Sequence, residues 1–188
     1  MNETLAKTIK AVNEPIKPYS PGSSEKESIK KELERLKSTQ VEIPIIINGE
    51  EIKTGNTANC VMPHNHNHVL GIYHQASKKE IGMAIESCLE VHKTWSTTSL
   101  DERCKIFQKM AELLQNKYRN TINASTMLGQ SKNIFQAEID SACELIDFFK
   151  FNCQYAQEIY GNQPCISPQG FKNHLEYRPL EGFVFAVT

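Results

Sequence analysis

The sequence predicts an α/β protein, and three observations support this. A β-branched run with a central Asn48-Gly49 pair (IPIIINGEEI, residues 43–52) is typical of two antiparallel strands joined by a tight turn. From Ser77 onward, apolar residues recur every three or four positions, which is the period of helices. The uninterrupted apolar run FVFAV near the end is typical of a strand covered on both faces in a parallel sheet. Because such sheets combine several strand–helix units, we interpret the chain as the front part of a larger α/β protein.

Composition and charge narrow the possible partners. The chain has 188 residues, 39% of them hydrophobic, and a formal net charge of −1. It therefore has no overall basic field that would attract nucleic acid or an anionic membrane surface. No apolar run approaches the ~18 residues that a membrane-spanning helix needs. We expect a packed protein with neither nucleic-acid nor membrane partners.

The first part of the chain predicts an arm followed by a helix. Residues 12–24 contain three prolines and cannot be helical, so we expect an extended arm lying on another part of the molecule. Ser24 is the predicted N-cap of a helix over Glu25–Leu36. The preceding segment Met1–Ala11 has no apolar stretch and no Arg, so it is not expected to be a signal or transit peptide.

Strand and helix signals then follow in order. Val61–Ala76 predicts a second strand pair around a histidine-rich turn. Ser77 with Glu80, and Ser99 with acidic residues after it, predict two helix starts. The remaining expected elements are a short helix near Asn120–Leu128, a long helix over Lys132–Tyr160 buried on more than one side, and strands at His174–Tyr177 and 182–188.

The histidine-rich turn suggests a metal site, and we weighed this first. In PHNHNHVLG (residues 63–71), His64, His66 and His68 stand at every second position, which would place them on one face of a strand. However, Pro63 and the intervening Asn residues favour a turn, and the run contains no acidic residue or Cys. We therefore expect a polar turn and no metal site.

Other reactive groups were weighed in the same way. The six cysteines are scattered, with no CxxC motif, and those in helical patterns lie beside apolar residues, so we expect reduced thiols and no nucleophile. No glycine-rich phosphate loop is present. Asp140, Glu144 and Asp147 form a stripe on the long helix, which most often means a solvated face. Because this helix is expected to be buried on more than one side, Glu144 is the best polar site candidate.

Several stretches together resemble one family. They are VNEPI (12–16), GSSEKESIKKELERLK (22–37), VMPHNHNHVLGIYHQA (61–76), GQSKNIFQAEIDSACELIDFFKFNCQYA (129–156) and YRPLEGFVFAVT (177–188). The chain is similar to the N-terminal part of the NAD-dependent aldehyde dehydrogenases, within them to the Δ1-pyrroline-5-carboxylate dehydrogenases. The long-helix stretch is the most specific to this branch.

The resemblance implies a function and some residue roles. It implies NAD as cofactor and oxidation of L-glutamate γ-semialdehyde to L-glutamate in proline breakdown. A cysteine thiolate and a glutamate do this chemistry in the family, and none of the present cysteines matches that position, so no catalytic residue is assigned here. Glu144 matches a family glutamate beside the aldehyde site, and Thr188 matches a position that meets the cofactor. The resemblance also implies a mitochondrial matrix location and a homodimer or higher homo-oligomer.

The same resemblance gives a division of the chain. Residues 1–40 would form the arm and a docking helix, and 41–161 the hairpins and helices of the NAD-binding domain. Residues 162–178 would be part of an oligomerisation flap, and 179–188 the first strand of a Rossmann-like sheet. We interpret the chain as an N-terminal fragment, inactive alone. The alternative is a non-enzymatic truncated chain that associates with full-length subunits.

Overall fold

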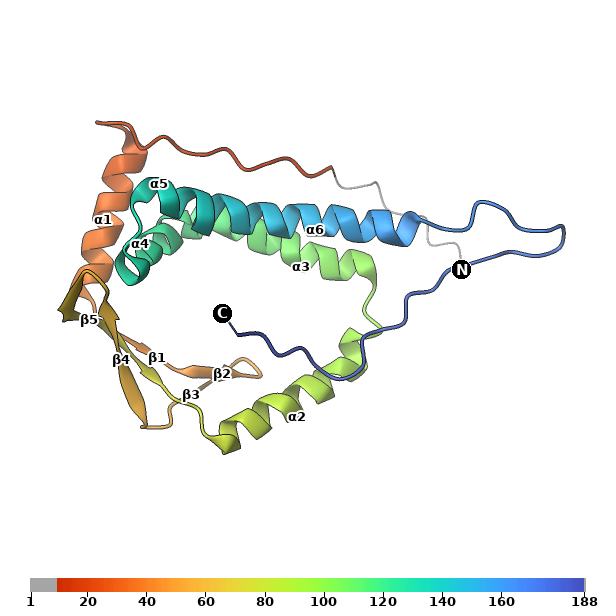
Figure 1. Ribbon diagram of the computed structural model, residues 1–188, viewed down its shortest axis with the longest axis horizontal. Helices are drawn as coiled ribbons and strands as arrows, with labels where there is room; N and C mark the ends of the chain where they lie inside the picture. Colours follow the sequence, from red (N-terminus) through yellow and green to blue (C-terminus); the bar gives the residue numbers. More distant parts are fainter. Residues whose placement is uncertain (1–9, 188) are drawn as a thin grey trace.

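The computed structural model describes residues 10–187, and its largest part is a layer of helices (Figure 1). Helix α3 (Leu100–Leu113) lies along α6 (Glu144–Gly161), with the rings of Phe107 and Phe149 stacked 5.8 Å apart. Between them the chain forms the π-helical segment η1 (Leu114–Tyr118), α4 (Arg119–Gln130), α5 (Ile134–Ala137) and a second π-helical segment, η2 (Glu138–Cys143).

The short helix predicted near Asn120–Leu128 is part of a longer helical run. The structure continues from α3 through η1 into α4 without a break, and Gly129 does not end it. The run ends after Gln130, where Ser131 takes a left-handed conformation with φ 58°. An extra residue per turn in η1 lets the chain change direction without ending the helix, which sequence periodicity does not reveal.

The long predicted helix forms over Ile134–Gly161, but only one of its faces is fully buried. Ala142, Ile146 and Cys153 are buried, whereas Phe148 and Tyr155 are 54% and 50% exposed. The expectation that this helix is buried on more than one side is therefore wrong within the described residues. The face of α6 that carries Phe148 and Tyr155 has no described element packed over it.

Helix α1 (Ser24–Ser38) packs on α4 and completes the apolar core at this end (Figure 1). Tyr19, Ile29 and Ala124 form the buried centre, with partly buried apolar residues around it: Leu33, Leu36, Met127 and Ile134. The N-cap is Ser23, whose hydroxyl accepts from the Lys26 N–H, so the prediction of Ser24 was wrong by one residue. The predicted extended arm is confirmed, since residues 10–20 have no regular secondary structure and run along α6 (Figure 1).

Two small sheets precede the helical layer. Strands β2 (Ile45–Ile47) and β3 (Glu50–Ile52) pair antiparallel, and both turn residues have positive φ, 54° at Asn48 and 79° at Gly49. Positive φ at both central residues is the requirement of a type I′ hairpin turn, so this prediction is confirmed.

The second sheet has the order β1-β5-β4, with β1 (Val41–Ile43) parallel to β5 (Asn65–His74) and β4 (Thr57–Met62) antiparallel to it. A Cβ at Gly71 would lie 2.6 Å from the Val41 carbonyl oxygen, so only glycine allows β1 to approach this closely. The predicted strand pair forms, but its first strand begins at Thr57, before the predicted segment Val61–Ala76, and the histidine-rich turn differs from the prediction. Only Pro63 and His64 lie in the turn, and His66 and His68 lie on β5.

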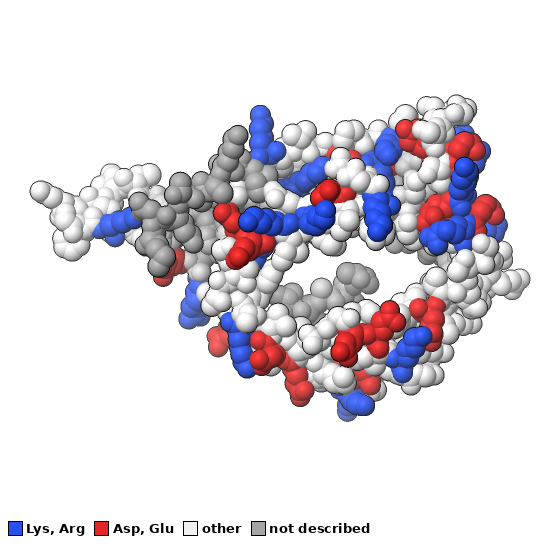
Figure 2. Space-filling model, turned by 180° about the vertical axis from the view of Figure 1, so that it is seen from behind, with Lys and Arg blue, Asp and Glu red and all other residues white. Residues whose placement is uncertain are grey.

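Helix α2 (Lys78–Trp95) connects the sheets to the helical layer (Figure 1). Its predicted capping box is present: Ser77 and Glu80 satisfy each other's backbone N–H groups, as do Ser99 and Glu102 at the start of α3. Figure 2 shows both signs of charge mixed over the visible face, with an opening between the helical layer and the side that carries α2. Within residues 10–187, no helix combines the length and apolar character that crossing a membrane requires.

The strands predicted at His174–Tyr177 and 182–188 do not form in the described residues. From Asn162 to residue 187 the chain has no helix or strand, and Ile166 and Phe185 are 82% and 81% exposed. A strand exists only with a neighbour to complete its hydrogen-bond ladder, and no described strand lies beside this segment. The apolar pattern is present without the pairing that would make it a strand.

Candidate functional site

The first candidate is the acidic stripe at the start of α6. Asp140 accepts a hydrogen bond from Lys132 Nζ at 2.7 Å, and Asp147 accepts bonds from the Asn13 side chain and the Glu14 N–H. Glu144 lies between them, is exposed, and makes no hydrogen bond or ion pair with any described residue. The burial argument for Glu144 was therefore wrong. Its carboxylate is nonetheless the one in this stripe that is not already engaged within residues 10–187.

The carboxylate that points inward is Glu138, six residues earlier. It is 0% exposed and begins η2. Its oxygens accept bonds from Tyr19 Oη at 2.9 Å and from Asn123 Nδ2 at 2.8 Å, and the Arg119 guanidinium forms an ion pair with it. Sequence reasoning missed this residue, although it stands four and eight positions before the buried Ala142 and Ile146 and so on their face of the helix.

A second carboxylate enters the same cluster from the arm. Glu14 accepts from Arg119 Nη1 at 2.6 Å and from Lys150 Nζ at 2.8 Å, and Arg119 Nη2 also donates to the Pro15 carbonyl at 2.8 Å. The side chains of Arg119 and Glu14 are 4% and 3% exposed. Two cations thus neutralise two carboxylates, which a buried charge cluster needs in order to be stable. The structure brings together residues from the arm, α4, η2 and α6 that no sequence motif joins.

The electrostatics of this cluster favour charged carboxylates and neutral thiol and phenol groups. Burial raises the pKa of Glu138, but the bond from Arg119 and further bonds to it have the larger combined effect, so its pKa lies below its ordinary value. Glu14 behaves likewise, through Lys150 and Arg119. Burial and the bond to Glu138 raise the pKa of Tyr19 to about 12. Burial and the charge of Glu138 raise the pKa of Cys143 to about 11, so this thiol is not a nucleophile at neutral pH.

Another buried thiol is equally inert. Cys153 donates to the Cys104 carbonyl across the contact between α3 and α6, and burial together with Cys104 raises the pKa of Cys153 to about 12. All six cysteines are free thiols. Of the three cysteines in helical patterns that were expected to be buried, Cys104 and Cys143 are buried, whereas Cys88 is exposed, so the expectation is wrong for Cys88. Cys104, Cys143 and Cys153 are packing residues.

Each of three histidines is bonded to a different element. His64 Nδ1 lies 2.8 Å from Ser131 Oγ, His68 Nε2 lies 3.0 Å from the Lys37 carbonyl oxygen, and His74 Nε2 lies 2.9 Å from Glu42 Oε1. Among residues 10–187, no three His, Cys, Asp or Glu side chains are close enough together to hold a metal ion. His64 and His68 connect this sheet to residues outside it, whereas His74 bonds to Glu42 on β1 of the same sheet.

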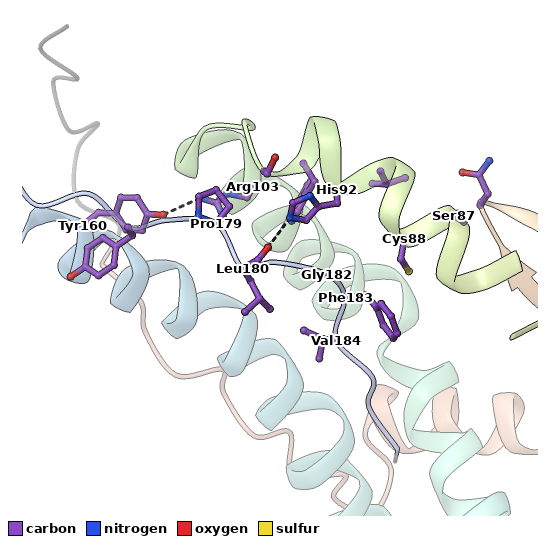
Figure 3. Close-up of a pocket in the computed structure, with 15 residues that line it drawn as sticks. Ser87, Cys88, His92, Arg103, Tyr160, Pro179, Leu180, Gly182, Phe183 and Val184 are labelled. Atoms are coloured by element: carbon purple, nitrogen blue, oxygen red, sulfur yellow. Dashed lines mark hydrogen bonds between the residues drawn. The ribbon is translucent and has the colours of Figure 1, made fainter. Parts of the chain in front are cut away.

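A cavity lies elsewhere, between α2, the start of α3, the end of α6 and the C-terminal segment (Figure 3). It measures about 500 Å³ and is lined mainly by apolar groups. In Figure 3 the His92 ring points to the Leu180 carbonyl oxygen, 2.7 Å away, and Arg103 to Tyr160 Oη, 3.4 Å away. Since His92 and Arg103 are used to hold the C-terminal segment and α6, the cavity offers packing space and no assembled catalytic group.

The N-termini of the described helices are where a pyrophosphate group could be held. A pyrophosphate binds where free backbone N–H groups point from a helix N-terminus. In the described part of the chain, α1, α2, α3 and α5 have N-termini closed by their own capping side chains, and α4 and α6 continue from π-helical segments. Thr188, the cofactor candidate from the sequence, lies outside the described residues.

A sequence profile of the aldehyde dehydrogenase family matches residues 51–188. The chain belongs to the aldehyde dehydrogenase family. A probable delta-1-pyrroline-5-carboxylate dehydrogenase of Schizosaccharomyces pombe is 45% identical over 177 residues, which are 94% of this chain and 32% of the relative. The mitochondrial delta-1-pyrroline-5-carboxylate dehydrogenase of Homo sapiens is 40% identical over 181 residues, or 96% of this chain and 32% of that relative.

Solved structures agree with the fold prediction. The Delta-pyrroline-5-carboxylate dehydrogenase of Mycobacterium tuberculosis superposes with a TM-score of 0.89 at 39% identity, covering 93% of this chain and 32% of that one. The same enzyme has also been solved with NAD bound. The predicted class is confirmed: this is the N-terminal part of the aldehyde dehydrogenase fold. The chain spans about a third of the length of the relatives that it matches.

Proposed function

We propose that this aldehyde dehydrogenase chain supplies the N-terminal part of an NAD-dependent Δ1-pyrroline-5-carboxylate dehydrogenase. The reaction is oxidation of L-glutamate γ-semialdehyde to L-glutamate in proline breakdown. The observation that carries the proposal is the joint agreement of sequence and fold with the Mycobacterium tuberculosis enzyme, at 39% identity and a TM-score of 0.89 over 93% of the chain.

Glu144 is the residue that we propose to lie beside the aldehyde substrate. Its carboxylate is exposed in the first turn of α6 and is not engaged by any described residue, whereas Asp140 and Asp147 on either side are. An unengaged carboxylate between two fixed ones is available to a substrate or to a residue outside the described part. Thr188 is proposed to meet NAD.

The chain by itself is proposed to be inactive. The family reaction needs a thiolate, and Cys143 and Cys153 have pKa values raised to about 11 and about 12. Cys104 is buried against α6. None of the six cysteines, the exposed Cys88 and Cys165 included, matches the position of the family nucleophile. The catalytic thiol and the cofactor site are therefore proposed to lie in residues that the described part does not contain.

A chimaera tests this proposal directly. Residues 1–188 would be joined to the remaining two-thirds of the Schizosaccharomyces pombe relative, and NADH formation would be measured with γ-semialdehyde. We expect activity from the chimaera and none from the 188-residue chain. A folded chimaera that oxidises other aldehydes but not the semialdehyde would contradict the proposed substrate, and activity of the short chain would contradict its proposed inactivity.

The role of Glu144 is tested in the same chimaera. We expect Glu144→Gln to raise KM for the semialdehyde, or lower kcat, with little effect on the Tm. The matched control is Glu158→Gln, which changes another exposed glutamate of α6 whose partner is Gln154 on the same helix. Equal kinetics for the two variants would remove Glu144 from the substrate site.

A second candidate function is association with full-length subunits. The segment from 162 to 187 exposes several large apolar side chains, among them Ile166, Phe171, Phe185 and Val187. Exposed apolar groups in one segment are typical of surfaces that pack against another chain. Co-purification of the 188-residue chain with the intact enzyme at fixed stoichiometry is the expected result, and a monomer that does not co-purify would contradict it. The intact enzyme is proposed to be a homodimer or higher homo-oligomer.

The proposed location is the mitochondrial matrix. It is supported by relatives named as mitochondrial from Dictyostelium discoideum, Emericella nidulans and Homo sapiens. Fractionation of cells that express the protein from its own gene tests this, and recovery outside mitochondria would contradict it.

A further inference from the structure

The arm, defined here as residues 10–22, is held as a bound peptide would be. Three of its backbone N–H groups donate to side chains of α6 and η2 and not to main chain: Ala11 to Gln154, Glu14 to Asp147 and Lys17 to Glu138, at 2.7, 2.7 and 2.8 Å. One of its carbonyls, at Pro15, accepts from Arg119. Side chains of the helices thus form hydrogen bonds with the backbone of the arm at four positions along an extended segment. Recognition of this kind depends on extended geometry as well as on side chains.

Two side chains of the arm supply sequence specificity. The Glu14 carboxylate fits between Arg119 and Lys150, and the Tyr19 hydroxyl donates to Glu138 while accepting from Asn123. Tyr19 and Glu14 are both 6% exposed, whereas Val12 and Ile16 between and beside them are 67% and 52% exposed. The surface therefore distinguishes inward from outward positions of the arm, as a peptide-binding groove does.

The arm joins the rest of the chain through one tight turn. The Ser23 N–H donates to the Ser20 carbonyl at 3.0 Å, and positive φ occurs at Tyr19 (48°) and Gly22 (79°). A positive φ at a tyrosine is strained, and the bonds of its hydroxyl compensate for this in the docked state. A short, tight hinge with a left-handed glycine next to a well-formed docking surface is an arrangement in which a segment can be exchanged between copies.

We propose that the surface formed by Arg119, Asn123, Glu138, Asp147, Lys150 and Gln154 is a peptide-recognition groove. Its second occupant is the arm of another copy of this chain, which replaces the chain's own arm. The groove carries two cations matched to one arm carboxylate and one internal carboxylate, so an arm with an uncharged residue at position 14 leaves a buried positive charge without a partner. This inference does not depend on the proposed reaction.

Cleavage of the hinge in the full-length chain provides the test. A specific protease site inserted between Pro21 and Gly22 lets the protein fold intact before the arm is cut. We expect the cut arm to co-elute with the body on gel filtration, and a fluorescent synthetic peptide of residues 10–22 to exchange into the groove. An arm that leaves on cutting, while the body remains folded by circular dichroism, would overturn the proposal.

Peptide variants distinguish specific recognition from non-specific binding. A Glu14→Gln peptide loses a charge-assisted bond and should bind roughly 10- to 100-fold more weakly. The matched control, Val12→Ala, changes an exposed position and should bind as the unmodified peptide does. Equal binding of all three peptides would overturn the assignment of a specific groove.

Exchange of the arm between two copies of the chain is tested by measuring the oligomeric state of a hinge variant. Deleting Pro21 and Gly22 shortens the hinge so that the arm can no longer fold back onto its own groove, and we expect a dimer by light scattering. Adding Glu14→Gln to this variant should shift the dimer to monomer. A hinge-deleted chain that is monomeric and folded, with its Tyr19 environment unchanged, would overturn arm exchange.

Discussion

The arm (residues 10–22) and the C-terminal segment (162–187) are both extended and contain apolar and proline residues, yet they are held very differently. The arm places Glu14 and Tyr19 in a buried cluster with Arg119 and Glu138. The C-terminal segment leaves Phe185 81% exposed and contacts the helices through a few bonds, such as that from His92 to the Leu180 carbonyl. Lack of regular secondary structure therefore does not mean lack of specific tertiary contacts. The difference between the two segments is that the arm has buried side chains that anchor it and the C-terminal segment does not.

The largest expected change in stability comes from substituting Glu138, the carboxylate at the centre of the buried cluster. Glu138→Ala should lower the free energy of unfolding by about 3–5 kcal/mol, because it leaves the Arg119 charge buried without its main partner. Chemical denaturation measures this. Glu144→Ala, an exposed change six positions along, should stay within about 0.5 kcal/mol. A similar decrease in the free energy of unfolding for both variants would contradict a stabilising role of the buried cluster.

Lowering the pH should destabilise the same cluster less than Glu138→Ala does, because a protonated carboxyl group can still form hydrogen bonds. The pKa values of Glu14 and Glu138 lie below their ordinary values when folded. Their stabilisation is therefore fully present above the unfolded pKa, near 4.3, and is lost as pH falls through the lower folded pKa. The protection of the Ala11, Glu14 and Lys17 amides from hydrogen exchange, measured relative to the intrinsic rate at each pH, should fall below about pH 4.3. Exchange in the C-terminal segment should already be fast and nearly independent of this transition.

A smaller effect is expected when one hydroxyl is removed in each segment. Tyr19→Phe loses the bond to the charged Glu138 and should cost about 1.5–3 kcal/mol. Tyr177→Phe loses only a 3.4 Å contact to the Ile159 carbonyl at a half-exposed position, and should cost less than about 0.5 kcal/mol. Thermal melts of the two variants give the comparison, and a reversed order would contradict the difference between the segments.

The smallest effect is expected at the exposed apolar positions. Phe185→Ser should change the stability of the 188-residue chain by no more than about 0.5 kcal/mol, because an 81% exposed side chain has little packing to lose. The same substitution should increase solubility, which light scattering at rising concentration measures. A loss of several kcal/mol would show that the segment is packed as firmly as the arm.

The sequence predicted the local structure well because its signals are local. The Ser77–Glu80 capping box, the Asn48-Gly49 turn and the helix over Ile134–Gly161 each depend on residues within a turn or two of one another. The family resemblance narrowed the predicted α/β class to the N-terminal part of the aldehyde dehydrogenase fold. Two of the wrong expectations are the separate short helix near Asn120–Leu128 and the strand at 182–188. A π-helical segment decides the first feature and a neighbouring strand the second.

By itself, then, the sequence determined the fold class, the caps of α2 and α3, the hairpin turn and the apolar stripe of the long helix. Only the tertiary structure decided which carboxylate is buried. Glu138 and Glu144 are both glutamates of one helical run, but Arg119 meets Glu14 across 105 positions of the chain and Tyr19 meets Glu138 across 119. A charge becomes stable inside a protein only where partners from distant segments converge on it, and no local pattern contains that convergence.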